Sequence, residues 1–427
     1  MGPVTRAFDL MCAAYSLFYA SALTLLLPVH CMKRPRRLRG RWLKERFGFV
    51  PGRGRAGERP LVWIHAVSVG EAMAARPLIE GVRPEADVVV STVTDTGQKV
   101  VRDFLTAGEE CIYVPFDTPS ATRRATGRIR PDMLVIMETE LWPNLIRTAR
   151  AEGVPILVAN GRISDASFSG YRRMRFFVKG MLAMVDSFCM QTERDAERIK
   201  ALGAPPERVR VTGNLKFDIS PPAGVPSWCG ELGRPVLVAG STHEGEEEII
   251  LDAFNSIKGR FRGATLVVAP RHPERFSEVE RLLRARGADF ARISGGAVRG
   301  KDVVLLDTIG ELHSVYGCAD ICIIGGSLVP KGGHNLFEPA SWARPVVCGP
   351  HMENFPLARE FIESGAAVEA GADELAGILD GLLSDADRAR EIGRRAGLLH
   401  AENSGAVLET VGEVKRLLRA SGRDAAA

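Results

Sequence analysis

Short apolar runs that alternate with amphipathic stretches dominate the middle of the chain. Between residues 61 and 211 each apolar run is followed by a stretch with helical spacing. Buried strands that alternate with helices form a parallel, doubly wound sheet. The strands predicted for this first series are residues 61–66, 88–92, 112–114, 133–137, 156–159, 187–190 and 209–211.

A second series of the same kind follows a proline-rich stretch. Residues 218–228, DISPPAGVPSW, hold three prolines and interrupt the alternation, as a linker between domains does. The strands predicted after this linker are residues 236–239, 266–269, 303–306, 321–324 and 346–348. From residue 372 onward the pattern is helical. We therefore expect two α/β domains, residues 49–220 and residues 221–427, that face each other across a cleft.

The N-terminal segment differs from both series. Residues 7–28 are apolar except for Asp9 and a few hydroxyl side chains, and they are just long enough to cross a bilayer. A cleaved signal peptide carries its positive charge ahead of the apolar stretch, whereas here the basic residues follow it. The positive-inside tendency then places the chain after Lys33 in the cytoplasm. Residues 1–48 are thus predicted to be a single membrane anchor with a basic juxtamembrane segment, and a helix lying in the membrane interface is the alternative.

The positive charge of the chain is concentrated in one segment. Residues 33–46 hold eight Lys or Arg and one Glu, a local charge of +7, so that the rest of a chain with net charge +4 is slightly acidic. This distribution argues against nucleic acid as a partner and suits an anionic membrane surface. The eight cysteines are scattered, mostly within apolar runs and without a CxxC pair, which indicates reduced thiols in a cytosolic compartment.

The strongest chemical signal lies in residues 321–350, ICIIGGSLVPKGGHNLFEPASWARPVVCGP. The pattern predicts a strand, a glycine loop, a helix that Asn335 can cap, and a second strand. Glu338 stands in the first turn of that helix. N–H groups at a helix start attract an oxyanion, glycines let a ligand approach the main chain, and a nearby carboxylate can accept from a ribose diol. The stretch therefore predicts a site for a phosphorylated ligand, with an ordinary strand-to-helix turn as the alternative.

Acidic and basic side chains follow predicted strands of the first domain. Glu71 stands in the first turn after the first strand, where it is either a capping charge or a general base that faces a ligand crevice. Glu138 and Glu140 follow the fourth strand, with two solvated acids as the alternative. Lys216 lies where the domain meets the linker and is expected either to face the cleft or to be an ordinary surface lysine.

Two further loops, GSTHE and APRHP, follow predicted strands of the second domain. Arg271 in the second loop suits a phosphate or carboxylate because its guanidinium binds both oxygens. The first loop does not form a zinc-protease motif, since HExxH needs a second histidine where Glu247 stands. Asp385 and Asp387 form a DxD pair, but at the start of a late helix, where we interpret them as first-turn acids.

One more stretch has a mixed basic and aromatic pattern. Residues 171–179, YRRMRFFVK, interleave four basic side chains with three aromatic ones. In a helix this pattern makes an amphipathic surface that can hold acyl chains beside lipid phosphates. The alternative is a helix packed on the sheet, with arginines that extend to solvent.

Several motifs occur together and in the order known from one family. They are HAVSVGE, STVTDTG, METELWPN, TGNLKFD, GSTHEGEE, APRHPERF, DTIGEL and GGSLVPKGGHNLFEPA. With this combination the chain resembles the 3-deoxy-D-manno-octulosonic acid (Kdo) transferases of lipid A biosynthesis, from the anchor onward. The resemblance implies a GT-B fold, CMP-Kdo as donor, the lipid A precursor lipid IVA as acceptor, and neither a cofactor nor a catalytic metal.

The resemblance also implies roles for individual residues. Glu71 matches the general base of the family, and Glu138 and Lys216 match residues implicated in stabilising the transition state. The positions that match the CMP-binding segments are Pro270, Arg271, Ile309, Gly310, Glu311, Asn335, Leu336, Phe337 and Glu338. Phe337 stands where many relatives are expected to have proline, which leaves the loop backbone less constrained but removes no charged group.

From the residues and the resemblance together we expect an inverting glycosyl transfer with Glu71 as general base. The first alternative is a GT-B glycosyltransferase at the membrane that uses another nucleotide-activated sugar. The second is a membrane-tethered nucleotide-binding protein without catalysis, which the carboxylates at strand ends of the first domain disfavour.

Overall fold

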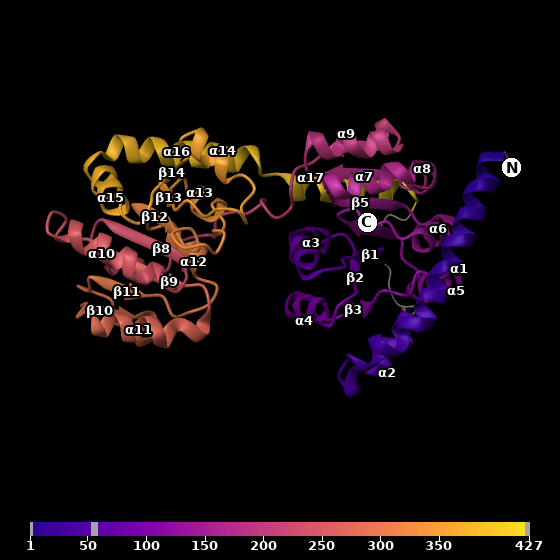
Figure 1. Cartoon of the computed structure of the whole chain (residues 1–427), viewed down its shortest axis with the longest axis horizontal. Helices are drawn as coiled ribbons and strands as arrows, with labels where there is room; N and C mark the ends of the chain where they lie inside the picture. The colour runs from indigo at the N-terminus through magenta and orange to yellow at the C-terminus, as the bar shows by residue number, and fades with distance from the viewer. Residues whose placement is uncertain (1–2, 53–58, 423–427) are drawn as a thin grey trace. The chain divides into compact units, whose positions relative to one another are not determined.

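The computed structural model describes residues 3–52 and 59–422, which form two compact units (Figure 1). Unit 1 comprises Met1–Asp218 and Ser404–Ala427, and unit 2 comprises Ile219–Asn403. Each unit contains a parallel sheet with helices on both faces. The two α/β domains predicted from the alternating pattern are confirmed, and each is described below by itself.

The sheet of unit 1 has the strand order β3-β2-β1-β4-β5-β6-β7. In its centre Ile64 on β1 lies opposite Val90 on β2 and Val135 on β4, and all three are fully buried. From β1 the following strands β2 and β3 lie on one side, whereas β4 to β7 lie on the other side. In wound sheets, ligands bind at the carboxyl ends of the two strands where the order diverges in this way. The strands are β1 (Leu61–His65), β2 (Asp87–Thr92), β3 (Glu110–Tyr113), β4 (Met133–Met137), β5 (Ile156–Gly161), β6 (Ser187–Met190) and β7 (Val209–Val211).

Helices cover both faces of this sheet, as Figure 1 shows. On one face lie α3 (Val69–Val82), α4 (Asp95–Phe104) and α17 (Ala406–Ala420). On the other face lie α5 (Pro119–Ile129), α6 (Pro143–Ala151), α7 (Asp165–Arg173), α8 (Arg175–Leu182) and α9 (Glu193–Leu202).

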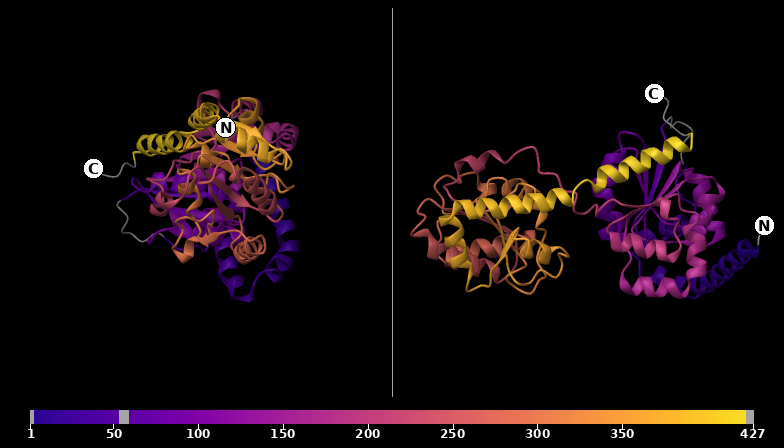
Figure 2. Two further views of the ribbon diagram at one scale, coloured as in Figure 1. Left: turned by 90° about the vertical axis from the view of Figure 1, so that its left-hand side faces the viewer. Right: turned by 90° about the horizontal axis from the view of Figure 1, so that it is seen from above.

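The C-terminal helix α17 is where the structure differs from the predicted domain boundaries. Its residue Val411 approaches α3 at Gly81, where an added Cβ would lie 2.7 Å from the valine side chain. Ser187 on β6 also donates to the Glu413 carboxylate at 2.6 Å. The sequence analysis assigned α17 to the second domain, but this helix belongs to unit 1. Figure 2 shows α17 in yellow after α16. A helical pattern gives the period of a helix but not the sheet on which it packs.

The sheet of unit 2 has the order β10-β11-β9-β8-β12-β13-β14 and diverges between β8 and β12. Its short edge strands β10 and β14 were not predicted, because their residues are mostly only partly buried and form no apolar run. The strands are β8 (Val236–Thr242), β9 (Thr265–Pro270), β10 (Phe290–Arg292), β11 (Val303–Leu305), β12 (Ile321–Ile324), β13 (Val346–Cys348) and β14 (Ala367–Glu369). The helices are α10 (Glu246–Lys258), α11 (Phe276–Ala285), α12 (Leu312–Tyr316), α13 (Phe337–Ala340), α14 (Ala358–Glu363), α15 (Leu375–Ser384) and α16 (Ala386–Glu402).

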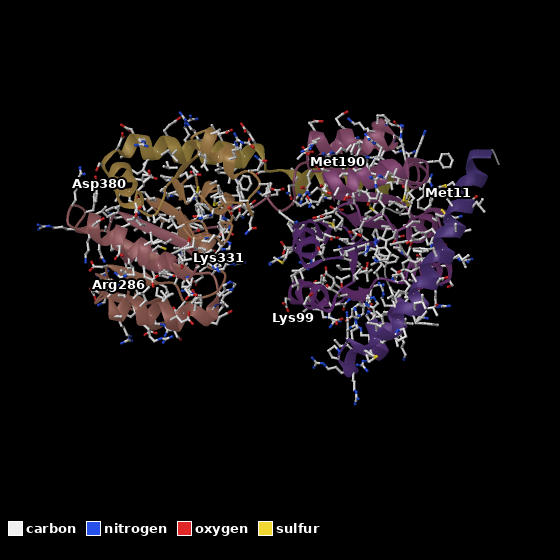
Figure 3. The ribbon with its side chains drawn as sticks, viewed as in Figure 1. Met11, Lys99, Met190, Arg286, Lys331 and Asp380 are labelled. Carbon is white, nitrogen blue, oxygen red and sulfur yellow. The ribbon has the colours of Figure 1, made fainter. Side chains whose placement is uncertain are left out.

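The N-terminal helix α1 (Pro3–Met32) lies along the side of unit 1. Phe8, Met11 and Tyr15 pack against the core of that unit, and Cys12 is fully buried in it; Met11 is labelled in Figure 3. By length and composition, residues Phe8–Met32 suffice to cross a membrane. The large apolar side chains exposed on this helix are Leu10, Leu17, Phe18, Leu25, Leu26, Val29 and Met32. α1 thus has one face packed on protein and one apolar face that is free.

The basic segment after α1 forms the helix α2 (Arg36–Arg46), whose side chains bind the backbone of the edge strand β3 and the residue after it. The Glu45 carboxylate accepts from the Tyr113 N–H at 2.8 Å, and Arg41 donates to the Cys111 carbonyl at 2.6 Å. Edge strands expose such groups, and α2 supplies their partners. Arg46, which is buried, likewise donates to the Val114 carbonyl at 2.8 Å. Part of the basic segment therefore serves the fold, and only the rest is available to a membrane surface.

Two further sequence predictions can be compared with the structure. Residues 171–179 form not one helix but the end of α7 and the start of α8, separated at Met174. Phe177 packs in the core, as the packed-helix alternative requires, whereas Phe176 is 49% exposed. The cysteines are buried except for Cys31, and none forms a disulfide within the described ranges.

Candidate active site

The side chains predicted to be functional lie at the carboxyl ends of neighbouring strands in each unit. In unit 1, Glu71 follows β1 and Glu138 follows β4, which are the two strands where the sheet diverges. In unit 2, the predicted residues follow β9, β11 and β12, and β8 lies between β9 and β12. This is the position in which open α/β sheets hold ligands.

Glu71 is held by the first turn of α3. Ser68 is the N-cap residue, and its Oγ accepts from the Glu71 N–H at 3.2 Å. The Glu71 carboxylate in turn accepts from Ser68 Oγ at 2.9 Å and from the Val67 N–H at 2.8 Å. This reciprocal arrangement is a variant of the capping box in which the N–H of the residue before the N-cap is the donor, so the capping interpretation of Glu71 describes its contacts correctly. Each carboxylate oxygen retains a second lone pair, so these bonds leave it able to take a proton.

The surroundings of Glu71 favour its protonated form. The side chain is only 5% exposed, and this burial raises the pKa of its carboxyl. The Val67 N–H and the Ser68 hydroxyl oppose that shift, whereas the negative charges of Glu138 and Glu140 add to it, and the net direction of the pKa is upward. A carboxylate with a raised pKa is a better general base near neutral pH.

Lys216 and Glu138 meet beside the start of α3. Lys216 Nζ lies 3.3 Å from Glu138 Oε1. A Cβ built on Gly70 would lie 3.9 Å from the same Nζ, so the lysine also reaches the residue next to Glu71. Because both side chains of the pair are partly exposed, the ion pair adds little stability, and both remain accessible to a ligand. The three residues predicted to be catalytic therefore converge on one place in unit 1.

Asn160 positions the loop of Lys216, and the sequence analysis did not identify it. Its side chain accepts from the Leu215 N–H at 3.0 Å, while Asn214 accepts from the Lys216 N–H at 3.0 Å. Asn160 and Glu138 both have left-handed backbones, with φ of 55° and 54°. Non-glycine residues in this region are strained, and such strain is concentrated at functional sites. A polar residue directly after a buried apolar run was the signal in the sequence.

His65, the last residue of β1, packs in the core next to this site. It is fully buried, its Nδ1 lies 3.0 Å from Ser91 Oγ, and its ring meets the Trp142 ring edge to face at 5.8 Å. Burial lowers the pKa of His65 to about 4, so the ring is neutral at neutral pH. A neutral ring held in the core acts as part of the packing beneath the carboxylates.

In unit 2, the Glu246 carboxylate binds the N–H groups at the start of the glycine loop, directly after β12, whereas the sequence analysis expected an oxyanion at the helix start after Asn335. This fully buried carboxylate accepts from the N–H groups of Gly326, Ser327 and Leu328 at 2.6, 3.0 and 2.9 Å, and from that of His243 at 2.9 Å. The start of the glycine loop is therefore bound by protein and is not open to an oxyanion. Glu246 precedes the loop by about 80 residues in a run of glutamates, where the sequence alone does not distinguish it from a first-turn acid.

The role predicted for Asn335 also needs correction. α13 spans four residues, and its N-cap residue is Leu336, which makes no side-chain capping bond. Asn335 Oδ1 instead accepts from the Phe337 N–H at 2.9 Å, closing a turn before the helix. Glu338 in the first turn is partly buried; burial raises its pKa and the nearby charge of Arg271 lowers it. Arg271 and Glu338, from separate segments, thus lie close enough to interact.

Three histidines gather against the glycine loop. His243 Nε2 and His334 Nε2 are 2.8 Å apart, and the His243 and His272 ring centroids are 5.5 Å apart. A Cβ on Gly326 would lie 3.1 Å from the His334 ring, and the φ of 69° at this residue also favours glycine. Burial, together with the positive charge of Arg271 and the neighbouring rings, lowers the pKa of His334 to about 4. The sequence analysis gave these residues no role, because they come from three separate motifs.

The remaining predicted binding residues surround the same end of the sheet. Pro270 is the buried last residue of β9. Ile309 is 80% exposed in the loop after β11, where Gly310 has a φ of 90° that favours glycine. Glu311 accepts from Thr308 Oγ1 at 2.6 Å, which fixes this loop. An exposed isoleucine in a fixed loop offers an apolar surface to a flat ligand.

The acidic pair in the late helix lies outside this cluster. Asp385 is the N-cap residue of α16 and accepts from the Arg388 N–H at 2.9 Å. Asp387 pairs with Arg390 on the surface. The interpretation of both as acids of a helix start is confirmed. Within residues 3–52 and 59–422, no group of three or more His, Cys, Asp or Glu side chains is arranged to hold a metal ion.

Comparison with known proteins extends this description. Residues 41–219 match the family described as 3-deoxy-D-manno-octulosonic-acid transferase (kdotransferase). A 3-deoxy-D-manno-octulosonic acid transferase of Haemophilus influenzae is 33% identical over 414 residues, which cover 92% of this chain and 96% of that protein. The enzyme of the same name from Bordetella pertussis is 37% identical over 380 residues, covering 82% and 87%.

A solved structure supports the fold. The putative UDP-N-acetylglucosamine 2-epimerase of Listeria monocytogenes superposes with a TM-score of 0.54 over 84% of this chain and 96% of that one. Its sequence identity is 15%, so this likeness concerns the fold alone.

Proposed function

The chain belongs to the 3-deoxy-D-manno-octulosonic acid (Kdo) transferase family and is a glycosyltransferase, and on that premise we propose that it moves Kdo from CMP-Kdo to the lipid A precursor lipid IVA with inversion at the transferred carbon. The observation that carries this proposal is the convergence of Glu71, Glu138 and Lys216 where β1 and β4 diverge. The family supplies the transferred sugar, and the site supplies the groups that the reaction needs.

Glu71 acts as the general base. Its carboxylate takes the proton of a glucosamine hydroxyl as that oxygen attacks the ketosidic carbon of Kdo. The bond from this carbon to the phosphate oxygen of CMP breaks, and CMP leaves with the electron pair. The raised pKa of Glu71 and its fixed orientation in the capping box support this role.

The donor is held by the cluster in unit 2. Arg271 binds the phosphate, and Glu338, which lies close to Arg271, accepts from the ribose hydroxyls. The loop that contains Ile309, Gly310 and Glu311 borders the nucleotide. The positive charge of Arg271 stabilises the departing CMP, so we propose that the reaction needs no metal and no cofactor.

The proposed location of the protein at a membrane rests on α1. Its free apolar face suits lipid, while its other face packs on unit 1 from Phe8 onward. A helix packed along a soluble unit does not cross a bilayer at the same time, so we propose that α1 lies in the surface of the inner membrane. Unit 1 is then on the cytoplasmic side, close to its lipid acceptor.

The substitution Glu71→Gln tests the proposal without disturbing the helix start. Glutamine satisfies a capping box as glutamate does, so the thermal stability is expected to be unchanged. Transfer from CMP-Kdo to lipid IVA is expected to fall about 10²–10⁴-fold, because one general base typically contributes that much. CMP binding is expected to stay the same. Near-normal turnover by this variant would show that Glu71 is a capping residue only.

A further inference from the structure

A cavity of about 230 Å³ lies in unit 1, between α1, α2 and the loops after β2 and β3. Leu23 and Leu26 of α1 and Val93 after β2 line its apolar side. Arg34 and Arg46 line its basic side, together with the Trp42 indole. None of these side chains has a part in the transfer reaction proposed above.

Two buried donors in this lining lack acceptors. Trp42 is 3% exposed and Arg46 is 6% exposed. Neither Trp42 Nε1 nor Arg46 Nε has a hydrogen-bond partner in the described part of the chain. An indole N–H and a guanidinium N–H can only donate, so the missing partner is a hydrogen-bond acceptor. Leaving such donors unpaired costs free energy, which a ligand can recover.

Other parts of the Arg46 guanidinium already have partners in the protein. Arg46 Nη1 donates to the Val114 carbonyl at 2.8 Å, and the guanidinium lies 4.2 Å above the Phe116 ring. Burial lowers the pKa of Arg46 to about 10, so the group is charged at neutral pH. The nearby Asp117 carboxylate is already bound by the N–H groups of Asn144 and Leu145.

Arg34 is arranged in the same way. Its guanidinium lies 4.1 Å above the Trp42 ring, and its Nε is 3.4 Å from Asp95 Oδ1. That oxygen also accepts from the Tyr113 hydroxyl at 2.6 Å. The carboxylates near the cavity are thus engaged elsewhere, and a ligand in the cavity can supply an acceptor for Trp42 Nε1 and Arg46 Nε.

We infer that this cavity binds a phosphate-bearing membrane lipid. The phosphate oxygens accept from Trp42 Nε1 and Arg46 Nε, and the start of an acyl chain lies along Leu23 and Leu26. A molecule with acceptor oxygens at one end and hydrocarbon at the other matches a cavity with one basic and one apolar side.

Two observations favour a membrane lipid over a free anion. Leu26 lines the cavity and is also half exposed on the free apolar face of α1, so the cavity continues into the surface that suits lipid. The volume is below the roughly 300–1,000 Å³ of sites that enclose a drug-sized ligand, so it holds a head group and not a whole lipid. The inference goes beyond the proposed function, because it does not depend on Glu71 or on the identity of the transferred sugar.

The first test measures phospholipid retained by the purified full chain in detergent, by extraction and mass spectrometry. Ala22→Phe places a ring in the cavity that Ala22 lines, and Ala14→Phe makes the same change at an exposed position of the same helix. The wild type and Ala14→Phe are expected to retain a phospholipid, and Ala22→Phe to retain at least about tenfold less. Equal retention in the two variants, or none in the wild type, overturns the inference.

The second test identifies the ligand chemistry by titrating the delipidated chain. Dihexanoyl phosphatidic acid is expected to bind, and Trp42→Phe to weaken that binding about tenfold, as the loss of one charge-assisted hydrogen bond does. Inorganic phosphate is expected to bind at least about tenfold more weakly, because it leaves the apolar side empty. Equal affinity for inorganic phosphate would mark a free-anion site, and an unchanged affinity in Trp42→Phe would remove the indole from the site. Either result overturns the inference.

Discussion

Replacing Glu246 by glutamine is expected to loosen the glycine loop of unit 2 while keeping the shape of the side chain. The carboxylate accepts from four backbone N–H groups, two at each oxygen. Glutamine retains one oxygen, which can keep two of these bonds. Its NH₂ group cannot accept and instead faces the other two N–H donors. Two buried N–H groups are thus left without an acceptor.

The expected cost follows from that count. A buried donor without a partner costs about 1–3 kcal/mol, so the two together cost about 2–6 kcal/mol. That is a large part of the roughly 5–15 kcal/mol by which a domain is stable. We therefore expect the loop to open locally, because opening returns both N–H groups to water.

Hydrogen exchange followed by mass spectrometry measures this opening directly. The amides of Gly326, Ser327 and Leu328 are expected to exchange faster in Glu246→Gln than in the wild type. Glu248→Gln is the matched control, since Glu248 lies in the same helix turn, is partly buried, and its Oε2 has no partner in the described part of the chain. Its effect on stability is expected to stay within about 0.5 kcal/mol. If the three amides exchange alike in both variants and the wild type, Glu246 does not hold the loop.

Three further predictions concern the substrates and the reaction. Arg271→Ala and Glu338→Ala are each expected to weaken CMP binding by about 1.5–3 kcal/mol in calorimetric titration, and unchanged affinity in both would place the nucleotide elsewhere. Because the negative charge of Glu140 raises the pKa of Glu71, Glu140→Gln is expected to move the acid limb of kcat to lower pH; a limb that stays in place would mean that Glu71 does not control it. Turnover is expected to survive EDTA, whereas complete loss with rescue by magnesium would reopen a metal role for Asp385.

The strands that carry the candidate site could be predicted from the sequence because they lie in the centre of each sheet. The central strands of a parallel sheet are buried on both faces, so β4 is a continuous apolar run from Met133 to Met137. The carboxyl end of each run then marks the crevice side, and for this reason Glu71, Glu138 and Arg271 could be named in advance. The edge strands β10 and β14 lack that double burial and therefore lack the pattern.

The contacts that hold the site in shape could not be predicted in the same way. Glu246 and Gly326 are brought together by the pairing of β8 with β12, and no local pattern encodes which of several glutamates turns inward. Asn160 acts on Leu215 by the same kind of long-range contact. The spacing of a helix likewise does not say on which sheet it packs, so α17 was placed with the wrong unit.

The return of α17 to unit 1 has a consequence for synthesis of the chain. Unit 1 begins at the N-terminus but is completed only by Ala406–Ala420, after all of unit 2. At about 5–20 residues per second, the ribosome needs roughly 10–40 s to pass from Asp218 to the end of α17. During that interval α3 lacks its covering helix, while α1 has already emerged with its free apolar face. The apolar face of α1 is thus exposed on the nascent chain before unit 1 has finished folding.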